Sequence, residues 1–249
     1  MNTFGLIGFP LGHSFSKAFF TDKFDKENIH AQYLNFELKH IADLEQVLQE
    51  QPNLIGFNIT IPYKEEIISR LSSLSPEAQA IGAVNVVKIK YNQGKTELIG
   101  HNSDVYGFVE SLRPMLQSWH KKALVLGTGG ASKAIVYGLQ SLGIHTQQVS
   151  RNRSNKAWSY QDITHEILCD YKLIVNCTPL GMYPNVENKP LLPYGQLTDQ
   201  HLLYDLVYNP EVTAFLSEGI KHKAAIKNGL EMLHLQALKA WEIWNTNED

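Results

Sequence analysis

Two hydrophobic periods follow one another along the first hundred residues. Apolar residues alternate or run together where strands are expected, and they recur at helical spacing in between. Strand patterns cover residues 3–8, 31–38 and 54–62, and helix patterns cover residues 17–29, 41–52 and 64–72. Strands that take turns with helices predict an α/β fold with a mostly parallel sheet.

Residues 84–102 have a different pattern. Two strand-like segments, 84–91 and 96–102, are separated by the turn sequence Asn-Gln-Gly-Lys. A short connection that contains Gly predicts a β-hairpin. A helix is expected over 104–116, and the strand–helix alternation starts again at residue 121. We therefore expect two α/β units with a boundary near residue 104.

The second half begins with a strand, a glycine turn, a helix and another strand within residues 121–154, which fits a βαβ unit. Further buried strands are expected within 171–179 and 201–210. Helices are expected at 211–219 and 228–244. The apolar stripe of the last helix has helical spacing and indicates a core-facing surface.

Composition narrows the classes of function. The chain has 249 residues, 43% of them hydrophobic and 19% charged, with a formal net charge of −3. Neither nucleic acid nor a membrane surface is an expected partner, because the chain has no basic excess. The N-terminus does not read as a signal peptide, and no apolar run reaches the roughly 20 residues of a spanning helix. A cytoplasmic protein is expected.

Cysteine and histidine give no sign of a metal site. Cys169 and Cys177 lack the CxxC spacing of a zinc ligand pair, and the ten histidines form no HExxH or HxH motif. We expect no metal. His13 and His101 are the histidines closest to candidate site residues, with a structural hydrogen bond as the expected role.

A glycine turn indicates a dinucleotide. Gly127, Gly129 and Gly130 directly follow the apolar strand 123–126. Such glycines make a tight turn and let a pyrophosphate approach the backbone, and the following helix N-terminus favours the phosphate charge. The third position of the fingerprint is Ser132 instead of Gly, which weakens the match. The strand before and the helix after strengthen it.

The end of the next strand favours NADP over NAD. An NAD site wants an acidic residue there for the ribose 2′-hydroxyl, but the stretch "QQVSRNRSNK" has none. Asn152, Arg153 and Ser154 stand there instead, and the forked donors of Arg suit a 2′-phosphate. A solvated basic loop is the alternative.

The stretch "GFNITIPYK" (56–64) places polar side chains at a strand end. Asn58 and Thr60 alternate with apolar residues, Pro62 ends the strand because it lacks an N–H, and Lys64 follows. Ligands of α/β proteins bind at such strand ends. A solvated strand face with a surface lysine is the alternative.

The motifs taken together resemble the shikimate dehydrogenase family, including its quinate/shikimate relatives. The resemblance covers nearly the whole chain, and the order and spacing of short motifs make it specific. They are "GHSFS" (12–16), "GFNITIPYK" (56–64), "GAVNVV" (82–87), "GHNSDVYG" (100–107), "GTGGASKA" (127–134), "NRS" (152–154), "NCTPLGM" (176–182), "YDLVYNP" (204–210) and "GLEMLHLQA" (229–237).

The resemblance implies a fold and an activity. Residues 1–103 and 231–249 are expected to form a substrate-binding and catalytic domain, and 104–230 a Rossmann-like NADP-binding domain, with a cleft between them. The implied reaction is the reversible NADPH-dependent reduction of 3-dehydroshikimate to shikimate in aromatic amino acid (chorismate) biosynthesis. The small-molecule substrate and NADP are the expected ligands. The chain could be a monomer or a homodimer.

The resemblance also implies roles for single residues. The catalytic pair is Lys64 and Asp104. The substrate-binding residues are Ser14, Ser16, Asn58, Thr60, Asn85, Asn102, Tyr208 and Gln236. The cofactor-binding residues are Gly127, Gly129, Gly130, Ala131, Asn152, Arg153, Ser154, Thr178 and Gly229.

Several residues fit more than one role, and more than one function fits the chain. Asp104 also fits a helix N-cap, and Tyr204 and Asp205 could be structural. The family usually has Asn where Phe9 stands and Pro where Lys17 stands, which bears on substrate preference. Ser103 stands where Thr is commoner. The rivals are a quinate/shikimate dehydrogenase that uses NAD or more substrates, a non-catalytic shikimate- or NADP-binding regulatory protein, and a folate-linked dehydrogenase of similar build.

Overall fold

The computed structural model of the chain describes residues 1–12, 14–92 and 94–246. His13, and Gln93 in the expected hairpin turn, lie outside the described residues. The chain divides into two compact units, Met1–Ser103 together with the segment from Gln236 onward, and Asp104–Leu235. The first boundary coincides with the start of a helix. The second falls inside the C-terminal helix, five residues beyond the expected position of 231, because that helix runs without a break from one unit into the other.

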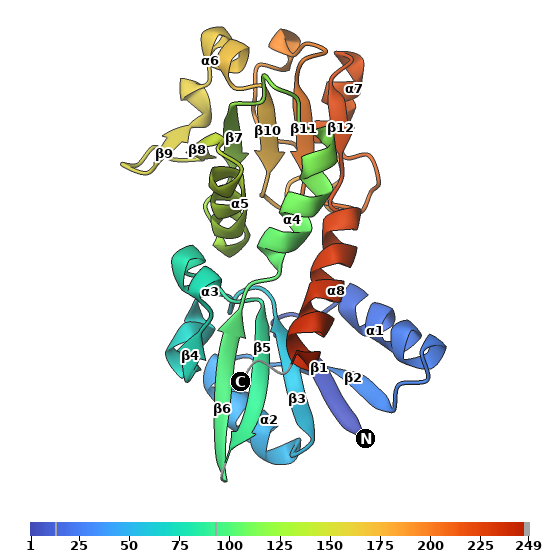
Figure 1. Ribbon diagram of the computed structural model, residues 1–249. Helices are drawn as coiled ribbons and strands as arrows, with labels where there is room; N and C mark the ends of the chain where they lie inside the picture. Colours follow the sequence, from blue (N-terminus) through green and yellow to red (C-terminus); the bar gives the residue numbers. More distant parts are fainter. Residues whose placement is uncertain (13, 93, 247–249) are drawn as a thin grey trace. The chain divides into compact units, whose positions relative to one another are not determined.

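The first unit contains a six-stranded sheet with the order β2-β1-β3-β5-β6-β4 (Figure 1). Strands β1, β2 and β3 are parallel, and β5 and β6 form the expected antiparallel hairpin. The strands are β1 (Asn2–Gly8), β2 (Ala31–Glu37), β3 (Leu54–Ile59), β4 (Ser73–Leu74), β5 (Val86–Asn92) and β6 (Lys95–His101). The helices are α1 (Phe15–Lys26), α2 (Leu44–Glu50), α3 (Pro76–Ile81) and the end of α8 (Leu230–Asn245), with 3-10 helices η1 (Ile41–Asp43) and η2 (Glu66–Arg70).

Alternate side chains of a strand point to opposite faces of the sheet. Here both faces carry a buried hydrophobic core. On one face, α1 and α8 cover an aromatic core in which Phe4, Phe20 and Trp244 are almost fully buried. The Trp244 indole donates a hydrogen bond to the Val87 carbonyl at 3.0 Å. A second core, which includes Phe57, lies on the other face. The C-terminal helix α8 therefore contributes to the aromatic core of the first unit.

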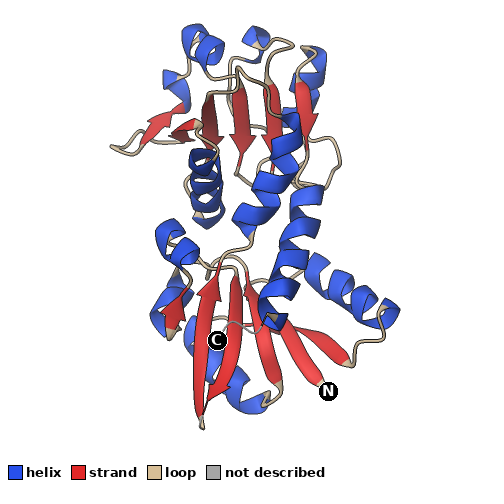
Figure 2. Ribbon diagram, in the orientation of Figure 1, coloured by secondary structure: helices blue, strands red, loops and turns tan. Residues whose placement is uncertain are grey.

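The second unit has a six-stranded sheet with the order β12-β11-β10-β7-β8-β9, and all of its neighbouring strands are parallel (Figure 2). Counted from the first strand of the unit, this is the doubly wound 3-2-1-4-5-6 order of dinucleotide-binding folds. The strands are β7 (Lys122–Leu126), β8 (His145–Ser150), β9 (Ala157–Ser159), β10 (Leu173–Asn176), β11 (Leu202–Asp205) and β12 (Ala225–Lys227). The helices are α4 (Asp104–Leu112), α5 (Gly130–Ser141), α6 (His165–Asp170), α7 (Ala214–Lys221) and the start of α8, with 3-10 helices η3 (Arg113–Met115), η4 (Tyr160–Asp162) and η5 (Tyr194–Gln196).

Two expected helices differ from their predictions. Residues 64–72 form turns and the 3-10 helix η2 instead of an α-helix, with i→i+3 bonds such as Leu71 N–H to the Ile68 carbonyl at 3.3 Å. The helix expected over 104–116 ends as an α-helix at Leu112, because Pro114 cannot continue its hydrogen bonding. No helix among the described residues is long and apolar enough to cross a membrane.

Candidate functional site

Several expected substrate residues join one buried hydrogen-bond network in the first unit. The Asn58 amide donates to the Asn85 carbonyl at 3.2 Å, and the Asn85 amide donates to Gln236 Oε1 at 3.3 Å. Asn58 and Asn85 lie on or beside β3 and β5, whereas Gln236 comes from α8. All three are at most 9% exposed. The network brings together side chains that are up to 178 residues apart in the chain.

Two residues that the sequence reading did not select complete this network. The Tyr33 hydroxyl on β2 donates to Asn58 Oδ1 at 2.7 Å, and it hydrogen-bonds to Ser16. Ser103 donates its backbone N–H to Asn85 Oδ1 at 2.7 Å, directly before Asp104. Tyr33 lies inside the expected strand 31–38 and has no sequence feature that marks it as a site residue. Only the fold brings its hydroxyl to Asn58. We name Ser16, Tyr33, Asn58, Asn85, Ser103 and Gln236 the amide network.

The two serines of the first motif lie at the start of α1. Ser14 is the N-cap, and its Oγ accepts the Lys17 N–H at 3.2 Å. Ser16 lies in the first turn and reaches the amide network through Tyr33. Ser14 therefore has a clear structural role, and both serines are half-buried.

Lys64 and Asp104 occupy well-defined backbone positions. Lys64 lies in the turn after β3, and its carbonyl accepts the Val84 N–H at 2.7 Å, which ties the turn to the start of the hairpin. Its side chain is half-buried. Asp104 is the first residue of α4 and is 7% exposed. A carboxylate in the first turn is stabilised by the helix dipole.

Thr60 and Asn102 are chain neighbours of the amide network, two residues after Asn58 and directly before Ser103. Thr60 donates its N–H to the Ile7 carbonyl at 2.9 Å. Asn102 is buried and donates to the Ala83 carbonyl at 2.9 Å. Asn102 also lines a cavity of about 370 Å³ whose wall includes Lys88, Lys90 and Lys239. Among the expected substrate residues Asn102 alone lines this cavity, so we do not identify it with the substrate site.

The glycine turn has the geometry that a dinucleotide needs. Gly127 follows β7 with φ +109°, a conformation that favours glycine. Gly129 is the N-cap of α5, and apart from its own local backbone and chain neighbours no atom of the described residues lies within 4 Å of the position where a Cβ would stand. Gly130 and Ala131 begin the helix. Open space in front of the first backbone N–H groups of a helix fits a pyrophosphate.

Ser132 stands at the third glycine position of the dinucleotide fingerprint, and its side chain stabilises the turn. Its hydroxyl donates to the Gly129 carbonyl at 2.7 Å and accepts from the Gln148 amide at 3.3 Å. It is 1% exposed. A serine is tolerated because its side chain folds back on the turn.

An acidic residue does reach the basic segment after β8. The sequence stretch has no acid, but Asp162 Oδ1 accepts a hydrogen bond from Arg153 at 3.2 Å. Asp162 is itself held by the N–H and hydroxyl of Ser159, which keep the pKa of its carboxyl below the usual range. Ser154 Oγ accepts the Ala157 N–H at 3.1 Å. Arg153 is therefore oriented by Asp162, which lies nine residues further along the chain.

A second buried cluster organises the ends of β10 and β11. Asn176 Oδ1 accepts from the N–H and hydroxyl of Thr178 at 3.1 and 2.6 Å. The Asn176 amide donates to Asp205 Oδ1 at 2.9 Å. Tyr208 follows three residues after Asp205 and is 37% exposed. The Thr178 turn and the Tyr208 turn thus share one support within the second unit.

Asp205 predicts a pH dependence of stability. Burial raises the pKa of its carboxyl to about 6, above the usual 3.8. The charge of Asp205 in turn contributes to the raised pKa of Cys177 and of Tyr194. The unfolded state therefore ionises first as the pH rises, and the free energy of unfolding falls between pH 3.8 and about 6. Asn does not titrate, so the free energy of unfolding of Asp205→Asn should increase relative to that of wild type as the pH rises through this window, by about 3 kcal/mol at most. Urea unfolding at several pH values measures this difference. A constant difference between the two proteins would contradict the prediction.

Gly229 is required by a close backbone approach. A Cβ at this position would lie 2.1 Å from the Leu206 carbonyl oxygen, a backbone atom that cannot rotate away. Gly229→Ala should therefore lower the free energy of unfolding by about 2–3 kcal/mol. Gly195→Ala is the matched control, because apart from its own local backbone and chain neighbours no atom of the described residues lies within 4 Å of its Cβ position. Equal urea midpoints for the two variants would contradict the prediction.

Proteins of known function are similar to this chain over nearly its whole length. Residues 6–87 match the family model of the shikimate dehydrogenase substrate binding domain. A curated shikimate dehydrogenase (NADP(+)) from Desulforamulus reducens is 34% identical over 265 residues, with 96% of this chain and 88% of the relative covered. The chain belongs to the shikimate dehydrogenase family.

Solved structures of the family have the same fold. Shikimate dehydrogenase from Aquifex aeolicus superimposes with a TM-score of 0.85 and 31% identity, covering 98% of this chain and 92% of that one. Shikimate 5-dehydrogenase from Thermus thermophilus, in complex with NADP(H) and shikimate, gives a TM-score of 0.85 and 30% identity, with 98% and 94% covered. The expected α/β fold with mostly parallel sheets is thereby confirmed.

Proposed function

We propose that this protein catalyses the reversible NADPH-dependent reduction of 3-dehydroshikimate to shikimate in aromatic amino acid biosynthesis. The observation that carries the proposal is full-length similarity to enzymes named shikimate dehydrogenase (NADP(+)). Lys64 and Asp104, the pair expected to do the chemistry, are both present. A purely ligand-binding protein has no need to keep both.

In this proposal the amide network and its neighbours hold the substrate. Asn58, Asn85 and Gln236 offer amide groups to the ring hydroxyls, and Ser14 and Ser16 offer hydroxyls to the carboxylate. Buried amides suit hydroxyl recognition because the hydrogen bonds of the network hold their donors and acceptors in place. Thr60, Asn102 and Tyr208 belong to the same proposed set.

The chemistry assigned to Lys64 is proton donation. When a ketone is reduced, negative charge develops on its oxygen, and an ammonium group can stabilise that charge and deliver the proton. Asp104 supports the ammonium and accepts a hydrogen bond from a substrate hydroxyl. When bound, NADPH supplies the hydride. In the reverse direction the Lys64 amine takes the proton from the shikimate hydroxyl.

The cofactor assignment rests on the second unit. Gly127, Gly129, Gly130 and Ala131 would carry the pyrophosphate on the backbone of the turn and of α5. Asn152, Arg153 and Ser154 would contact the adenosine ribose and its 2′-phosphate, with Arg153 as the forked donor. Thr178 and Gly229 complete the set. The doubly wound strand order supports it, since dinucleotides bind where that order reverses.

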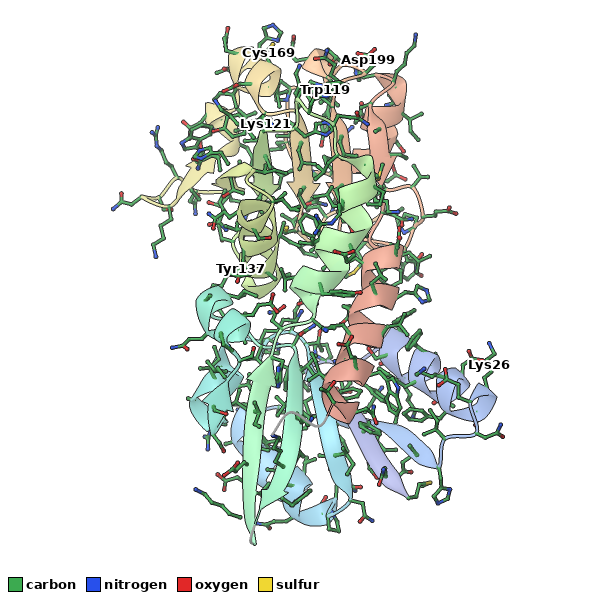
Figure 3. The ribbon with its side chains drawn as sticks, viewed as in Figure 1. Lys26, Trp119, Lys121, Tyr137, Cys169 and Asp199 are labelled. Atoms are coloured by element: carbon green, nitrogen blue, oxygen red, sulfur yellow. The ribbon has the colours of Figure 1, made fainter. Side chains whose placement is uncertain are left out.

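A cytoplasmic location is part of the proposal. Both cysteines are free thiols, and Cys169 projects from α6 at the surface (Figure 3). Free thiols suit a reducing compartment. A net charge of −3 gives nucleic acid no electrostatic reason to bind. Monomer and homodimer are to be distinguished by light scattering.

The test is reduction of NADP⁺ by the purified protein with shikimate, followed by NADPH absorbance, with NAD⁺ and quinate run beside them. Fast turnover with NADP⁺ and shikimate alone is the expected result. Comparable turnover with quinate or NAD⁺ would establish the broader quinate/shikimate enzyme. Binding of both ligands without turnover would mean a regulatory protein.

A further inference from the structure

Asp205 is a fully buried carboxylate that is held by donors from three places. Asn176 donates its amide at 2.9 Å, Val207 donates its backbone N–H at 3.0 Å, and Thr213 donates its hydroxyl at 2.6 Å. Asp205 and Thr213 are both 0% exposed. An ionised carboxylate only accepts hydrogen bonds, so this set of three donors matches the charged form.

The Asn176 contact ties Asp205 to the Thr178 turn. The Asn176 side chain uses its amide for Asp205 and its oxygen for the N–H and hydroxyl of Thr178. Thr178 Oγ1 in turn lies 3.4 Å from the Leu180 N–H. If Asp205 no longer accepts, the Asn176 amide is free to turn, and the Thr178 turn loses its anchor.

The other two contacts tie Asp205 to the Tyr208 turn. Val207 immediately precedes Tyr208, and the Val207 carbonyl accepts the Gly229 N–H at 3.3 Å. Thr213 caps α7 by accepting the Leu216 N–H at 3.2 Å, which closes the segment 206–213 at its far end. Asp205 thus holds both ends of the segment that carries Tyr208.

We propose that Asp205 is a positioning residue that fixes the Thr178 turn and the Tyr208 turn together from one buried carboxylate. The proposal rests on the proposed function, in which Thr178 serves the cofactor and Tyr208 the substrate. One side chain then sets the distance between a cofactor contact and a substrate contact. Asp205 itself is 0% exposed and would act only through these turns.

The stability cost of Asp205 supports this role. Burial raises the pKa of its carboxyl to about 6, so keeping it charged at neutral pH lowers the stability of the fold. The amide of Asn has the same shape and carries no charge. A residue that served only the fold would gain stability from that exchange, because Asn avoids the cost of a buried charge.

The experiment compares Asp205→Asn with wild type near neutral pH. Asn176 and Val207 donate to Oδ1, and Thr213 donates to Oδ2. In the variant the remaining oxygen can serve Asn176 and Val207, and the NH₂ group cannot accept from Thr213. The group also loses its charge, so the bonds from Asn176 and Val207 are no longer charge-assisted and weaken. We expect the KM values for NADP⁺ and for shikimate to rise together, each about tenfold, the usual effect of one hydrogen bond to a charged group. The urea midpoint should not fall.

Tyr204→Phe is the matched control. Tyr204 precedes Asp205 on β11, is 0% exposed, and shares a buried hydrogen bond of 2.7 Å with Ser111. Its loss should lower the urea midpoint and leave both KM values unchanged. A structural role of Asp205 would give the same pattern, so unchanged KM values in Asp205→Asn would overturn the proposal. A rise in only one KM would refute the coupling of the two turns.

A second variant keeps the proposal testable if Asp205→Asn does not fold. Thr213→Val removes one donor and keeps the carboxylate, so the KM for shikimate should rise while that for NADP⁺ stays the same. Thr213→Ser keeps the hydroxyl and should leave both KM values as in wild type. No change in Thr213→Val would count against the proposal. If wild type shows no turnover, the proposed function fails first, and calorimetric binding of NADP⁺ and of shikimate to the same variants still decides about Asp205.

Discussion

Replacing Lys64 by Ala should lower kcat by about 10²–10⁴-fold, the span expected when a general acid is removed. The lysine lies in the turn after β3, and its carbonyl contact with the Val84 N–H is a backbone contact that the substitution keeps. The turn should therefore survive, and the KM for shikimate should change little. Stopped-flow or steady-state measurement of NADPH formation gives kcat directly.

Two controls separate chemistry from folding in this experiment. Lys95→Ala removes an exposed lysine from the hairpin of the same unit and should retain wild-type kcat. A small primary amine added to Lys64→Ala should restore part of the turnover, because it can replace the missing proton donor. Near-wild-type kcat in Lys64→Ala would refute the role of the lysine.

The fold was predictable wherever periodicity was strong. The strand at 54–62 and the hairpin at 84–102 were read from alternation, and both are present as β3 and β5–β6. The 64–72 segment shows the limit: its apolar spacing is helical, but it is short, follows Pro62, and becomes a 3-10 helix. The two- and three-residue strands β4 and β12 carry too few residues for any period to appear.

For the candidate site, the sequence suggested residues and roles that stay predictions, and their contacts came only with the fold. Asn58, Asn85 and Gln236 were expected around one substrate, and the fold joins them in one network. Tyr33 was missed because an aromatic residue in a strand ordinarily reads as core. Asp162 was missed because it meets Arg153 through the β9–η4 turn, and local sequence does not encode that approach.

The cofactor preference supplies the second large effect. Arg153→Ala should raise the KM for NADP⁺ about tenfold or more, because a charge-assisted hydrogen bond to the 2′-phosphate is lost. The KM for NAD⁺, which lacks that phosphate, should stay within about twofold of wild type, since the substitution then removes no charged contact. Both are measured at saturating shikimate.

Asp162 makes this prediction sharper. Its carboxylate already accepts a hydrogen bond from the Arg153 guanidinium at 3.2 Å. The arginine must therefore bind the 2′-phosphate with the N–H groups that do not contact Asp162. Lys156→Ala, in the same exposed segment, is the control for nonspecific charge, and it should raise the KM for NADP⁺ only slightly because an exposed lysine adds little beyond screened attraction. Equal effects of Arg153→Ala and Lys156→Ala would mean that net charge, and not the fork of Arg153, selects the phosphate. An equal rise in the KM for NAD⁺ would mean that Arg153 supports the adenosine pocket as a whole.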